Sequence, residues 1–262
     1  MMPVRGAIAR IGRSLREGKT MSFEKLKELF ILNFVEKQRW KYLVEGLGNT
    51  MLITLFAVLL GVAIGIVVAS VRSTFDKEQE TLKRRGGFGY FILRFFNGIC
   101  KVYITVIRGT PVVVQLMILY FIILASSRND LLVAVLAFGI NSGAYVAEII
   151  RAGIMSIDNG QFEAGRSLGF GYIKTMTYII IPQAFKNILP ALLNEFIALL
   201  KETSVAGYVG IMDLTKAGDT IRGVTYSSFM PLTAIALIYL LIVMILTKLV
   251  SVIERKLRKN ER

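Results

Sequence analysis

The sequence predicts an all-α, polytopic membrane protein with about five transmembrane helices. Three observations lead to this fold class: 54% of the residues are hydrophobic, only 19% are charged, and the apolar residues gather in long runs. Gly46–Val71 contains 26 consecutive residues without a charge, enough for a helix to cross a hydrocarbon core of roughly 30 Å. A soluble domain carries about a quarter charged residues, so a membrane environment explains the composition.

The five spans are assigned from the apolar runs and their flanks, at about 46–71, 95–127, 131–150, 187–208 and 226–250. The fourth differs from the others because Pro190, Glu195, Lys201 and Glu202 interrupt it. Hydrocarbon tolerates so many polar groups only where neighbouring helices or water satisfy them. This span is therefore predicted to lie inside the bundle, along a path that water can enter.

The ends of the chain differ from its middle. Residues 1–21 are basic and without apolar periodicity, so a disordered tail is expected there, and residues 256–262 are expected to form a basic cytoplasmic tail. Residues 22–41 have the pattern of an amphipathic helix. This helix either lies on the membrane surface or docks on the first span. Residues 42–255 are assigned to the transmembrane domain.

Basic residues orient the chain. The segment Arg72–Arg94, predicted to be a loop, and the tail from Lys248 are rich in Lys and Arg, so both are predicted to be cytoplasmic. Five spans then place the N-terminus outside, yet residues 1–41 contain ten Lys and Arg. A translation start at Met21 would remove five of these, and we take this as a hypothesis. N-terminal sequencing of the native protein that found residue 3 or 5 would contradict it.

Composition excludes several classes of function. The formal charge of +14 suggests a nucleic-acid partner in a soluble protein, but here it fits short cytoplasmic loops, and no nucleic-acid-binding motif is present. One cysteine and no histidine exclude a disulfide framework, the common zinc sites and serine–histidine or cysteine–histidine catalysis. Gly12–Thr20 resembles a phosphate-binding loop but has one residue too many between its glycines. We expect no enzyme activity, catalytic residue or metal site in this chain.

Polar side chains within the predicted spans are candidates for a substrate path, because an ionisable residue at a helix centre costs at least roughly 2.5–3.5 kcal/mol on insertion scales. Asn141, Tyr145 and Glu148 fall on one face of the third span. Glu148 can instead form a simple pair with Arg151 near the headgroups. For Asn194 and Glu195 in the fourth span, a position near the headgroups remains the alternative to a role in a path.

A polar segment at about 156–185 separates the third and fourth spans. Asp158 and Gln161 have the spacing of a capping box, so a short helix is predicted to begin there. Gly169 can end that helix in the left-handed conformation, and a second helix is predicted to run from about Tyr172 until Pro182 bends it. Such a cytoplasmic hairpin suggests a docking site for a soluble partner, with an ordinary interfacial loop as the alternative.

The hairpin resembles a known motif. Glu163-Ala164-Gly165, followed by Gly169 and by Ile179-x-Ile181-Pro182, is similar to the EAA-x3-G-x9-I-x-L-P loop of binding-protein-dependent ABC transporter permeases. Gly165 stands in place of the second alanine and Ile181 in place of the leucine. Further segments resemble the polar amino acid uptake branch of that family: GLGNTMLITL, IRGTPVVVQL, NSGAYVAEIIRAGI and NEFIALLKETS. The resemblance covers about residues 42–255.

The resemblance implies an ABC type-1 permease fold in a bacterial plasma (inner) membrane. It also implies a function, which is import of a polar amino acid driven by a separate ATPase that uses ATP-Mg, so this chain would itself bind no cofactor. The partners would be that ATPase, an extracellular or periplasmic solute-binding protein and a second permease, identical or related. The residues of the ATPase-coupling loop would be Glu163, Ala164, Gly165, Arg166, Gly169, Ile179 and Pro182. In this scheme Glu163 anchors the ATPase and Gly169 allows the turn.

The substrate path is inferred from polar residue types. Side chains that can bind an ammonium or a carboxylate inside the bundle are Asn141, Ser142, Glu148, Asn194 and Glu195. An ion-coupled secondary transporter of small polar solutes is the alternative function; internal repeats would support it, and none is found. The sequence leaves open which amino acid is carried and whether the permease pairs with itself.

Overall fold

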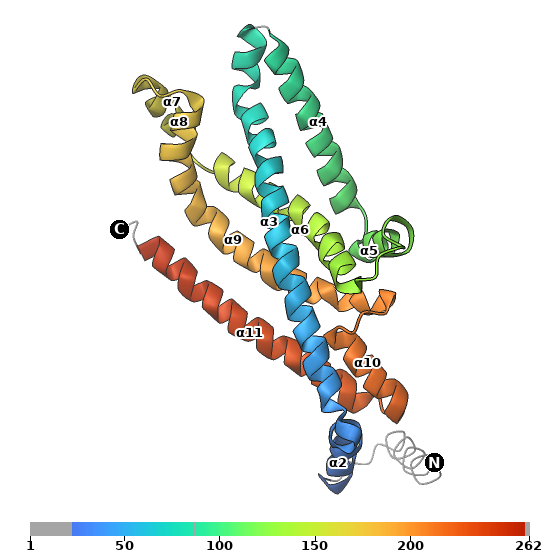
Figure 1. The fold of residues 1–262 in the computed structure, drawn as a ribbon. Helices are drawn as coiled ribbons and strands as arrows, with labels where there is room; N and C mark the ends of the chain where they lie inside the picture. Colours follow the sequence, from blue (N-terminus) through green and yellow to red (C-terminus); the bar gives the residue numbers. More distant parts are fainter. Residues whose placement is uncertain (1–22, 86, 260–262) are drawn as a thin grey trace. The chain divides into compact units, whose positions relative to one another are not determined.

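The computed structural model describes residues 23–85 and 87–259, and every regular element among them is a helix. Figure 1 shows the elements with their labels. Five helical segments in this part of the chain are long and apolar enough to cross a membrane: Trp40–Arg84, Phe88–Gly109, Asp130–Met155, Tyr172–Val209 and Phe229–Leu257. The predicted fold class is thus confirmed. The predicted basic tail at 1–21 and the possible start at Met21 lie outside the described residues.

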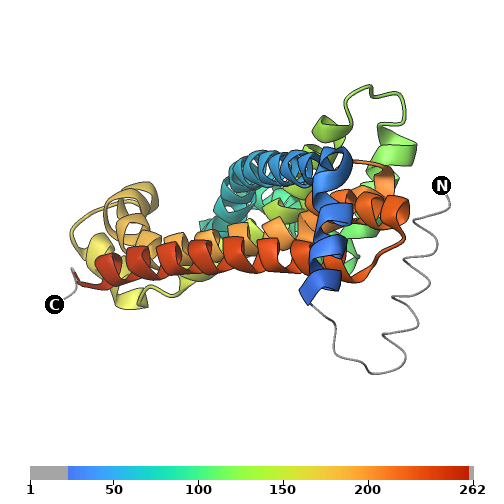
Figure 2. The ribbon, with the colours of Figure 1, turned by 90° about the horizontal axis from the view of Figure 1, so that it is seen from below.

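The chain divides into two compact units, and the first contains residues up to Met51 together with Ser204–Ile242. Its elements are α2 (Phe23–Phe30), a π-helical turn (Ile31–Val35), a 3-10 turn (Glu36–Gln38), the start of α3 (Trp40–Arg85), a 3-10 helix (Thr203–Val209), α10 (Leu214–Thr225) and the start of α11 (Phe229–Lys259). Figure 2 shows α2 lying across the direction of the first turns of α3.

The helix predicted over residues 22–41 is shorter and broken in the structure. Its α-helical part ends at Phe30, and the backbone bends at Lys37 and Gln38, which have φ of 52° and 55°. Asn33 is fully buried and accepts a hydrogen bond from Oγ1 of Thr225 on α10 at 2.8 Å. The segment is therefore held against protein within the first unit.

The second unit contains Leu52–Thr203 and the end of the chain from Val243. It holds the remainder of α3, α4 (Phe88–Gly109), α5 (Val112–Ile118), a π-helical turn (Leu119–Ile123), α6 (Asp130–Met155), α7 (Asn159–Ser167), α8 (Tyr172–Thr175), a π-helical turn (Met176–Ile180), α9 (Ile181–Glu202) and the last part of α11. In this unit α6 packs along α9 and also contacts α4 and α5. α6 is itself largely buried, with buried residues spread from Val133 to Ile154.

Between α3 and α5, two predicted boundaries differ in the structure. The span predicted at 95–127 is not one helix, because α4 ends at Gly109 and a separate helix, α5, begins at Val112. Pro111 immediately precedes α5 and has no N–H to donate to a continuing helix. The segment 72–94, predicted as a loop, is helical over most of its length, since α3 continues to Arg85 and α4 begins at Phe88. Asp76 and Glu78 of this extension form ion pairs with Arg151 and Arg166, which stabilises a helix in a polar stretch.

Close contact between α3 and α6 depends on two pairs of glycines spaced four residues apart. A Cβ on Gly61 would lie 3.0 Å from the Ser142 side chain, and one on Gly65 would lie 2.4 Å from Val146. A Cβ on Gly139 would lie 2.6 Å from Leu60. Small residues at these positions let the two backbones approach, as membrane helices commonly require.

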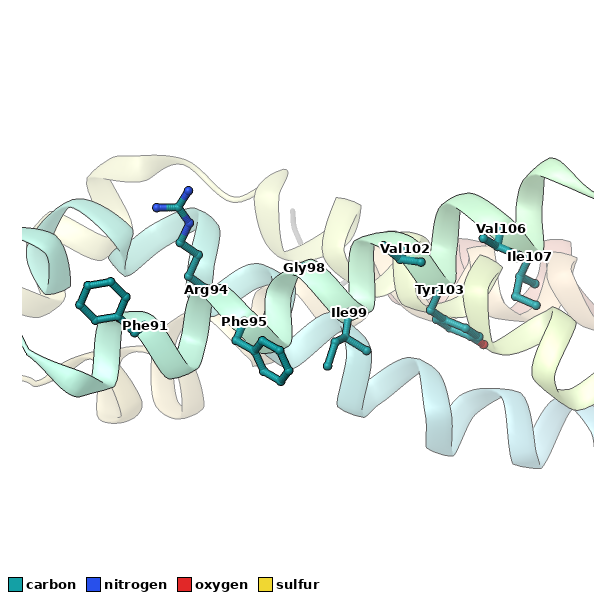
Figure 3. Close-up of a pocket in the computed structure, with 9 residues that line it drawn as sticks. All are labelled: Phe91, Arg94, Phe95, Gly98, Ile99, Val102, Tyr103, Val106 and Ile107. Atoms are coloured by element: carbon teal, nitrogen blue, oxygen red, sulfur yellow. The ribbon is translucent and has the colours of Figure 1, made fainter.

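Along α4 an open, apolar hollow of about 1000 Å³ runs past Phe95, Gly98, Ile99 and Val102 (Figure 3). Its lining side chains all come from α4 itself, with Arg94 near one end. Exposed apolar side chains are the normal surface of a membrane-length helix.

Candidate functional site

The first helix of the loop that resembles the EAA motif is capped as its sequence predicts. Asp158 is the N-cap residue of α7, and its Oδ1 accepts a hydrogen bond from the backbone N–H of Gly160 at 2.7 Å. The reciprocal half of the capping box is absent among the described contacts, because the side-chain oxygen of Gln161 accepts from Gln183 on α9 at 3.3 Å. The cap therefore fixes where α7 begins, and Gln161 ties α7 to α9.

Gly169 ends α7 in the left-handed conformation, with φ of 77°. The N–H of Phe170 donates to the carbonyl of Gly165 at 3.0 Å, and the N–H of Gly169 donates to that of Arg166 at 2.9 Å. These two bonds form a Schellman motif, which satisfies the last carbonyls of a helix and favours glycine at this position. The backbone conformation of Gly169 thus explains why a glycine is suited to the turn predicted at this position.

A small apolar core holds α7 against the helices on either side of it. Phe162, Ile180 and Ile188 are buried in this core together with Ile154 at the end of α6. Gly165 is buried as well, and a Cβ there would lie 2.7 Å from both Cγ2 and Oγ1 of Thr175. The glycine that replaces the usual alanine thus leaves room for the side chain of Thr175 on α8.

The same loop is fastened to the extended end of α3. Arg166 donates to Glu78 at 2.7 Å, and the ammonium of Lys77 lies 4.4 Å from the ring centroid of Phe162. Lys77 also donates to the side chain of Asn159 at 2.6 Å. The extension of α3, predicted as a loop, therefore braces the hairpin.

The outer side of the hairpin carries the predicted contact residues. Glu163 and Ala164 are exposed on α7. Large apolar side chains are exposed nearby, with relative exposures of 70% for Leu168, 77% for Ile173 and 71% for Tyr178. An exposed carboxylate among exposed apolar groups is the pattern of a protein-docking surface. Ile179 is half-buried and packs against the core of the hairpin, whereas Pro182 is exposed and lies in the first turn of α9.

The polar residues predicted for a substrate path separate into distinct groups. Asn141 is buried and donates to Oε1 of Gln115 on α5 at 2.9 Å. Gln115 in turn donates to the carbonyl of Ile107 at 2.7 Å and to Oγ1 of Thr110 at 2.8 Å. This network closes the break between α4 and α5, so Asn141 has a structural role there.

Ser142 and Glu195 meet across the contact between α6 and α9. Oγ of Ser142 donates to Oε1 of Glu195 at 3.0 Å. Ser142 is fully buried, whereas Glu195 is half-buried. Arg108 at the end of α4 is close enough to interact electrostatically with Glu195 as well as with Glu148. A carboxylate and a cation therefore face the same region of the bundle.

Glu148 belongs to an ion network, as its pairing with Arg151 predicts. Both carboxylate oxygens of Glu148 accept from Arg151 at 3.2 Å. Arg151 also bonds Asp76 on α3 at 3.1 Å, and Arg108 lies 4.0 Å from Glu148 and 5.1 Å from the ring centroid of Tyr145. The pairing of Glu148 with Arg151 is thus present in the structure.

Asn194 lies apart from these groups. It is exposed, and its Nδ2 donates to the carbonyl of Pro190 at 3.0 Å within α9. The sequence made both Asn194 and Glu195 candidates for a substrate path, because both are polar and lie within a predicted span. Successive residues of a helix point about 100° apart, so only one of them can face α6.

Three residues of the polar groups were not among the candidates: Gln115, Arg108 and Asp76. Gln115 and Arg108 lie in IRGTPVVVQL, where a lone amide and a lone guanidinium in an apolar stretch were available signals. Asp76 lay in a segment taken for a loop, so no sequence signal marked it.

The sequence is similar to a described family and to several known proteins. The sequence matches the family described as the binding-protein-dependent transport system inner membrane component over residues 86–259. It is 39% identical to the arginine transport system permease protein ArtQ of Bacillus subtilis, over 84% of this chain and 94% of that protein. It is 35% identical to the glutamine transport system permease protein GlnP of Escherichia coli K12, over 82% and 93%.

Solved structures give the same result. The crystal structure of an amino acid ABC transporter with histidines matches with a TM-score of 0.72 and 38% identity, over 91% of this chain and all of that chain. An inward-facing structure of the MetNI methionine ABC transporter matches with a TM-score of 0.69 over 83% of this chain and 97% of that one. Its identity is 18%, so this second match supports the fold alone.

Proposed function

Because this chain belongs to the family of binding-protein-dependent transport system inner membrane components, we propose that it is the permease of an ATP-driven importer of polar amino acids. Arginine and glutamine are the named cargo of its curated relatives, and histidines accompany the related crystal structure. Members of the family are multi-pass inner-membrane proteins and are not themselves catalytic. They act with an ATPase and a binding protein.

The observation that carries the proposal is the construction of the coupling loop. Glu163, Leu168 and Ile173 of this loop are exposed, while the other side of the same loop is packed on α6 and α9 and bonded to α3. A rigid hairpin of this kind transmits the movement of a docked partner to the helices that hold it. Closure of the ATPase subunits on ATP would therefore move α3, α6 and α9 through this contact.

Within this scheme the exposed loop residues have separate roles. Glu163 is the polar anchor in the ATPase groove, and the apolar groups around it supply the buried area of the contact. Arg166 already bonds Glu78, so it acts mainly as a brace. Gly165, Gly169, Ile179 and Pro182 maintain the loop geometry.

The polar groups near Arg108 form the proposed substrate path. The substrate carboxylate needs a cation, which Arg108 supplies, and its ammonium needs an acceptor, which Glu195 or Glu148 supplies. Ser142 positions Glu195 through the 3.0 Å hydrogen bond. A second permease, identical or related, completes the transporter in this proposal.

Reconstitution tests the function. The chain is co-expressed with its ATPase and reconstituted into liposomes with the binding protein, and uptake of radiolabelled L-arginine and L-glutamine is measured with ATP or with ADP. We expect uptake only with ATP and with a bound ATPase. Uptake that continues without ATP under an ion gradient would instead support a secondary transporter.

The path is tested by neutral substitutions. Glu195→Gln keeps the shape of the side chain and removes its charge, so we expect lower uptake with unchanged ATPase binding. Glu80→Gln, which neutralises an exposed carboxylate on α3, is the control. Unchanged uptake in Glu195→Gln would remove this residue from the path.

A further inference from the structure

The open hollow along α4 is apolar except at one end. Its volume is about 1000 Å³, and its lining side chains come from successive turns of that helix (Figure 3). Among the described residues that line it, Arg94 alone is charged. The hydroxyl of Tyr103, also in the lining, donates to the carbonyl of Ile140 at 2.6 Å. The hollow therefore offers a ligand one guanidinium and a long apolar surface.

The guanidinium of Arg94 is free to receive a counter-charge. Arg94 is exposed, and in the part of the chain that the structure describes its side chain forms no hydrogen bond or ion pair. Lys83 and Arg84 are exposed near the end of α3 in the same hairpin, and Glu80 is exposed one turn before them. Basic side chains thus outnumber acidic ones around this end, which fits an anionic group.

The depth of Arg94 in the membrane follows from its neighbours on α3. The charge-free run of α3 ends at Val71, and Arg72 donates to Oδ1 of Asn97 on α4 at 3.0 Å. Asn97 therefore lies at the edge of the hydrocarbon, on the side that the basic residues mark as cytoplasmic. Arg94 is one turn nearer the start of α4, about 4.5 Å further along the helix axis. This places its guanidinium at the level of the lipid phosphates.

The apolar part of the hollow has the length of one leaflet. It extends from Gly98 to Ile107, which is about 14 Å of helix at roughly 1.5 Å per residue. Half of a hydrocarbon core of roughly 30 Å is about 15 Å. At Gly98 a Cβ would meet nothing within 4 Å, so the hollow is open next to its basic end. An acyl chain that begins at Arg94 can therefore lie along α4 through its own leaflet.

These features favour a phospholipid over a second permease as the occupant. Two further basic residues of α4, Lys101 and Arg108, are absent from the lining of the hollow. Arg108 instead lies 4.0 Å from Glu148, so the hollow is separate from the charged groups of the candidate path. A zwitterionic headgroup would add an ammonium beside the basic residues, whereas an anionic headgroup adds only the complementary charge.

We propose that the hollow along α4 binds an anionic phospholipid of the cytoplasmic leaflet, with the phosphate on Arg94 and an acyl chain along Gly98, Ile99 and Val102. Charge-assisted hydrogen bonds from the guanidinium hold the phosphate, and the apolar face of α4 receives the chain. This inference does not depend on the proposed function, since its test measures no transport.

Tryptophan quenching in vesicles tests the site on the full chain. Trp40 is the one tryptophan of the sequence, so Trp40→Phe combined with Phe95→Trp places a single fluorophore in the hollow. The protein is reconstituted into mixed vesicles in which either phosphatidylglycerol or phosphatidylcholine carries brominated acyl chains, and quenching gives the relative affinity of the two lipids. We expect phosphatidylglycerol to be preferred about fivefold, the ratio that corresponds to about 1 kcal/mol for one basic residue at a membrane surface. Leu59→Trp, exposed within the charge-free run of α3, is the control fluorophore and should show no preference.

Variants at the two ends of the site sharpen the test. In the Phe95→Trp background, Arg94→Gln should lower the preference for phosphatidylglycerol about fivefold, and Arg94→Lys should retain most of it. Arg128→Gln changes an exposed arginine between α5 and α6 and should leave the preference unchanged. Gly98→Leu fits without meeting another residue at its Cβ, yet it should also lower the preference, because the leucine occupies the space of the acyl chain.

Three results would overturn the proposal. Equal quenching by the two lipids, or a preference that persists in Arg94→Gln, would show that Arg94 selects no anionic lipid. A preference that is lost in Arg94→Gln but unchanged in Gly98→Leu would mean that the charge attracts lipids without a chain seated in the hollow. If neither brominated lipid quenches the Phe95→Trp protein while both quench Leu59→Trp, a second permease covers the hollow and the lipid proposal is wrong.

Discussion

Arg166 donates from Nη2 to Oε1 of Glu78 at 2.7 Å and so joins the coupling loop to the far end of α3. The two residues are separated by 88 positions in the sequence. Glu78 is mostly buried, with 14% side-chain exposure, while Arg166 is 58% exposed. The loop that is proposed to receive the ATPase is therefore attached to three helices, α3, α6 and α9, and the predictions below test that attachment.

Arg166→Ala and Glu78→Gln should impair ATP-driven uptake to a similar degree, because each removes the same brace. The loss of folding stability should be small, about 1 kcal/mol or less, because the pair is partly exposed. The double variant should be no worse than either single one. Uptake and thermal unfolding measured on all three variants check this, and the charge-swapped pair Arg166→Glu with Glu78→Arg should recover part of the activity. Strictly additive losses would mean that Arg166 acts independently, for instance by contacting the ATPase.

Glu163→Lys should abolish uptake while the protein remains in the membrane. Glu163 is exposed, so folding is little affected, whereas reversing a charge at an interface costs about 2–5 kcal/mol, a loss of more than tenfold in ATPase binding. Co-purification of the ATPase and uptake are the measurements. Gln161→Lys, which lies on the side of α7 facing α9, is the control and should retain ATPase binding. Normal ATP-coupled uptake in Glu163→Lys would refute the anchor role.

Gly165→Ala should destabilise the coupling loop by about 1–3 kcal/mol, the usual cost of overpacking. The new methyl group would lie 2.7 Å from Thr175. Adding Thr175→Ala should restore part of the stability, because it removes the two atoms that the methyl group meets. Gly171→Ala is the matched control, since a Cβ there has nothing within 4 Å. Thermal unfolding of the purified complex distinguishes the variants, and equal stability of Gly165→Ala and the parent would contradict the packing argument.

Asp213, the N-cap residue of α10, should make the stability of the protein depend on pH. It is fully buried, its Oδ1 accepts from the N–H of Lys216 at 2.5 Å, and its Oδ2 has no hydrogen-bond partner among the described residues. Burial raises the pKa of Asp213 to about 6, against about 4 in an unfolded chain. The native state thus holds this proton more tightly, and its stabilising effect is complete below about pH 4 and is lost as the pH rises through about 6.

Asp213→Asn should flatten this dependence, because an amide keeps the capping oxygen and does not titrate. Thermal unfolding of both proteins between about pH 4 and about pH 7 measures the difference. Asp219→Asn changes an exposed carboxylate that pairs with Arg222 and should keep the slope of the parent. If Asp213→Asn also keeps that slope, another group carries the pH dependence.

Much of the protein follows from local sequence patterns. The apolar runs predict five membrane-length helices because crossing hydrocarbon requires length and low charge, and both are local properties. The Asp158 cap and the Gly169 turn were predictable for the same reason, since each depends on the backbone of a few neighbouring residues. The face shared by Asn141, Tyr145 and Glu148 follows from helical periodicity.

Other features depend on partners distant in sequence, and only the tertiary structure decided them. Residues 72–85 read as a loop because they are charged, yet Asp76 and Glu78 find Arg151 and Arg166 and remain helical. The adjacent residues Asn194 and Glu195 were both candidates for a substrate path, but Asn194 lines a pocket with Glu254 of α11, whereas Glu195 accepts a hydrogen bond from Ser142. The sequence by itself determined which polar side chains are costly to leave without a hydrogen bond or ion pair in a membrane. Only the tertiary structure decided which partners provide those bonds. The reason is that helical geometry turns neighbouring residues to different sides, while packing brings residues that are distant in sequence together.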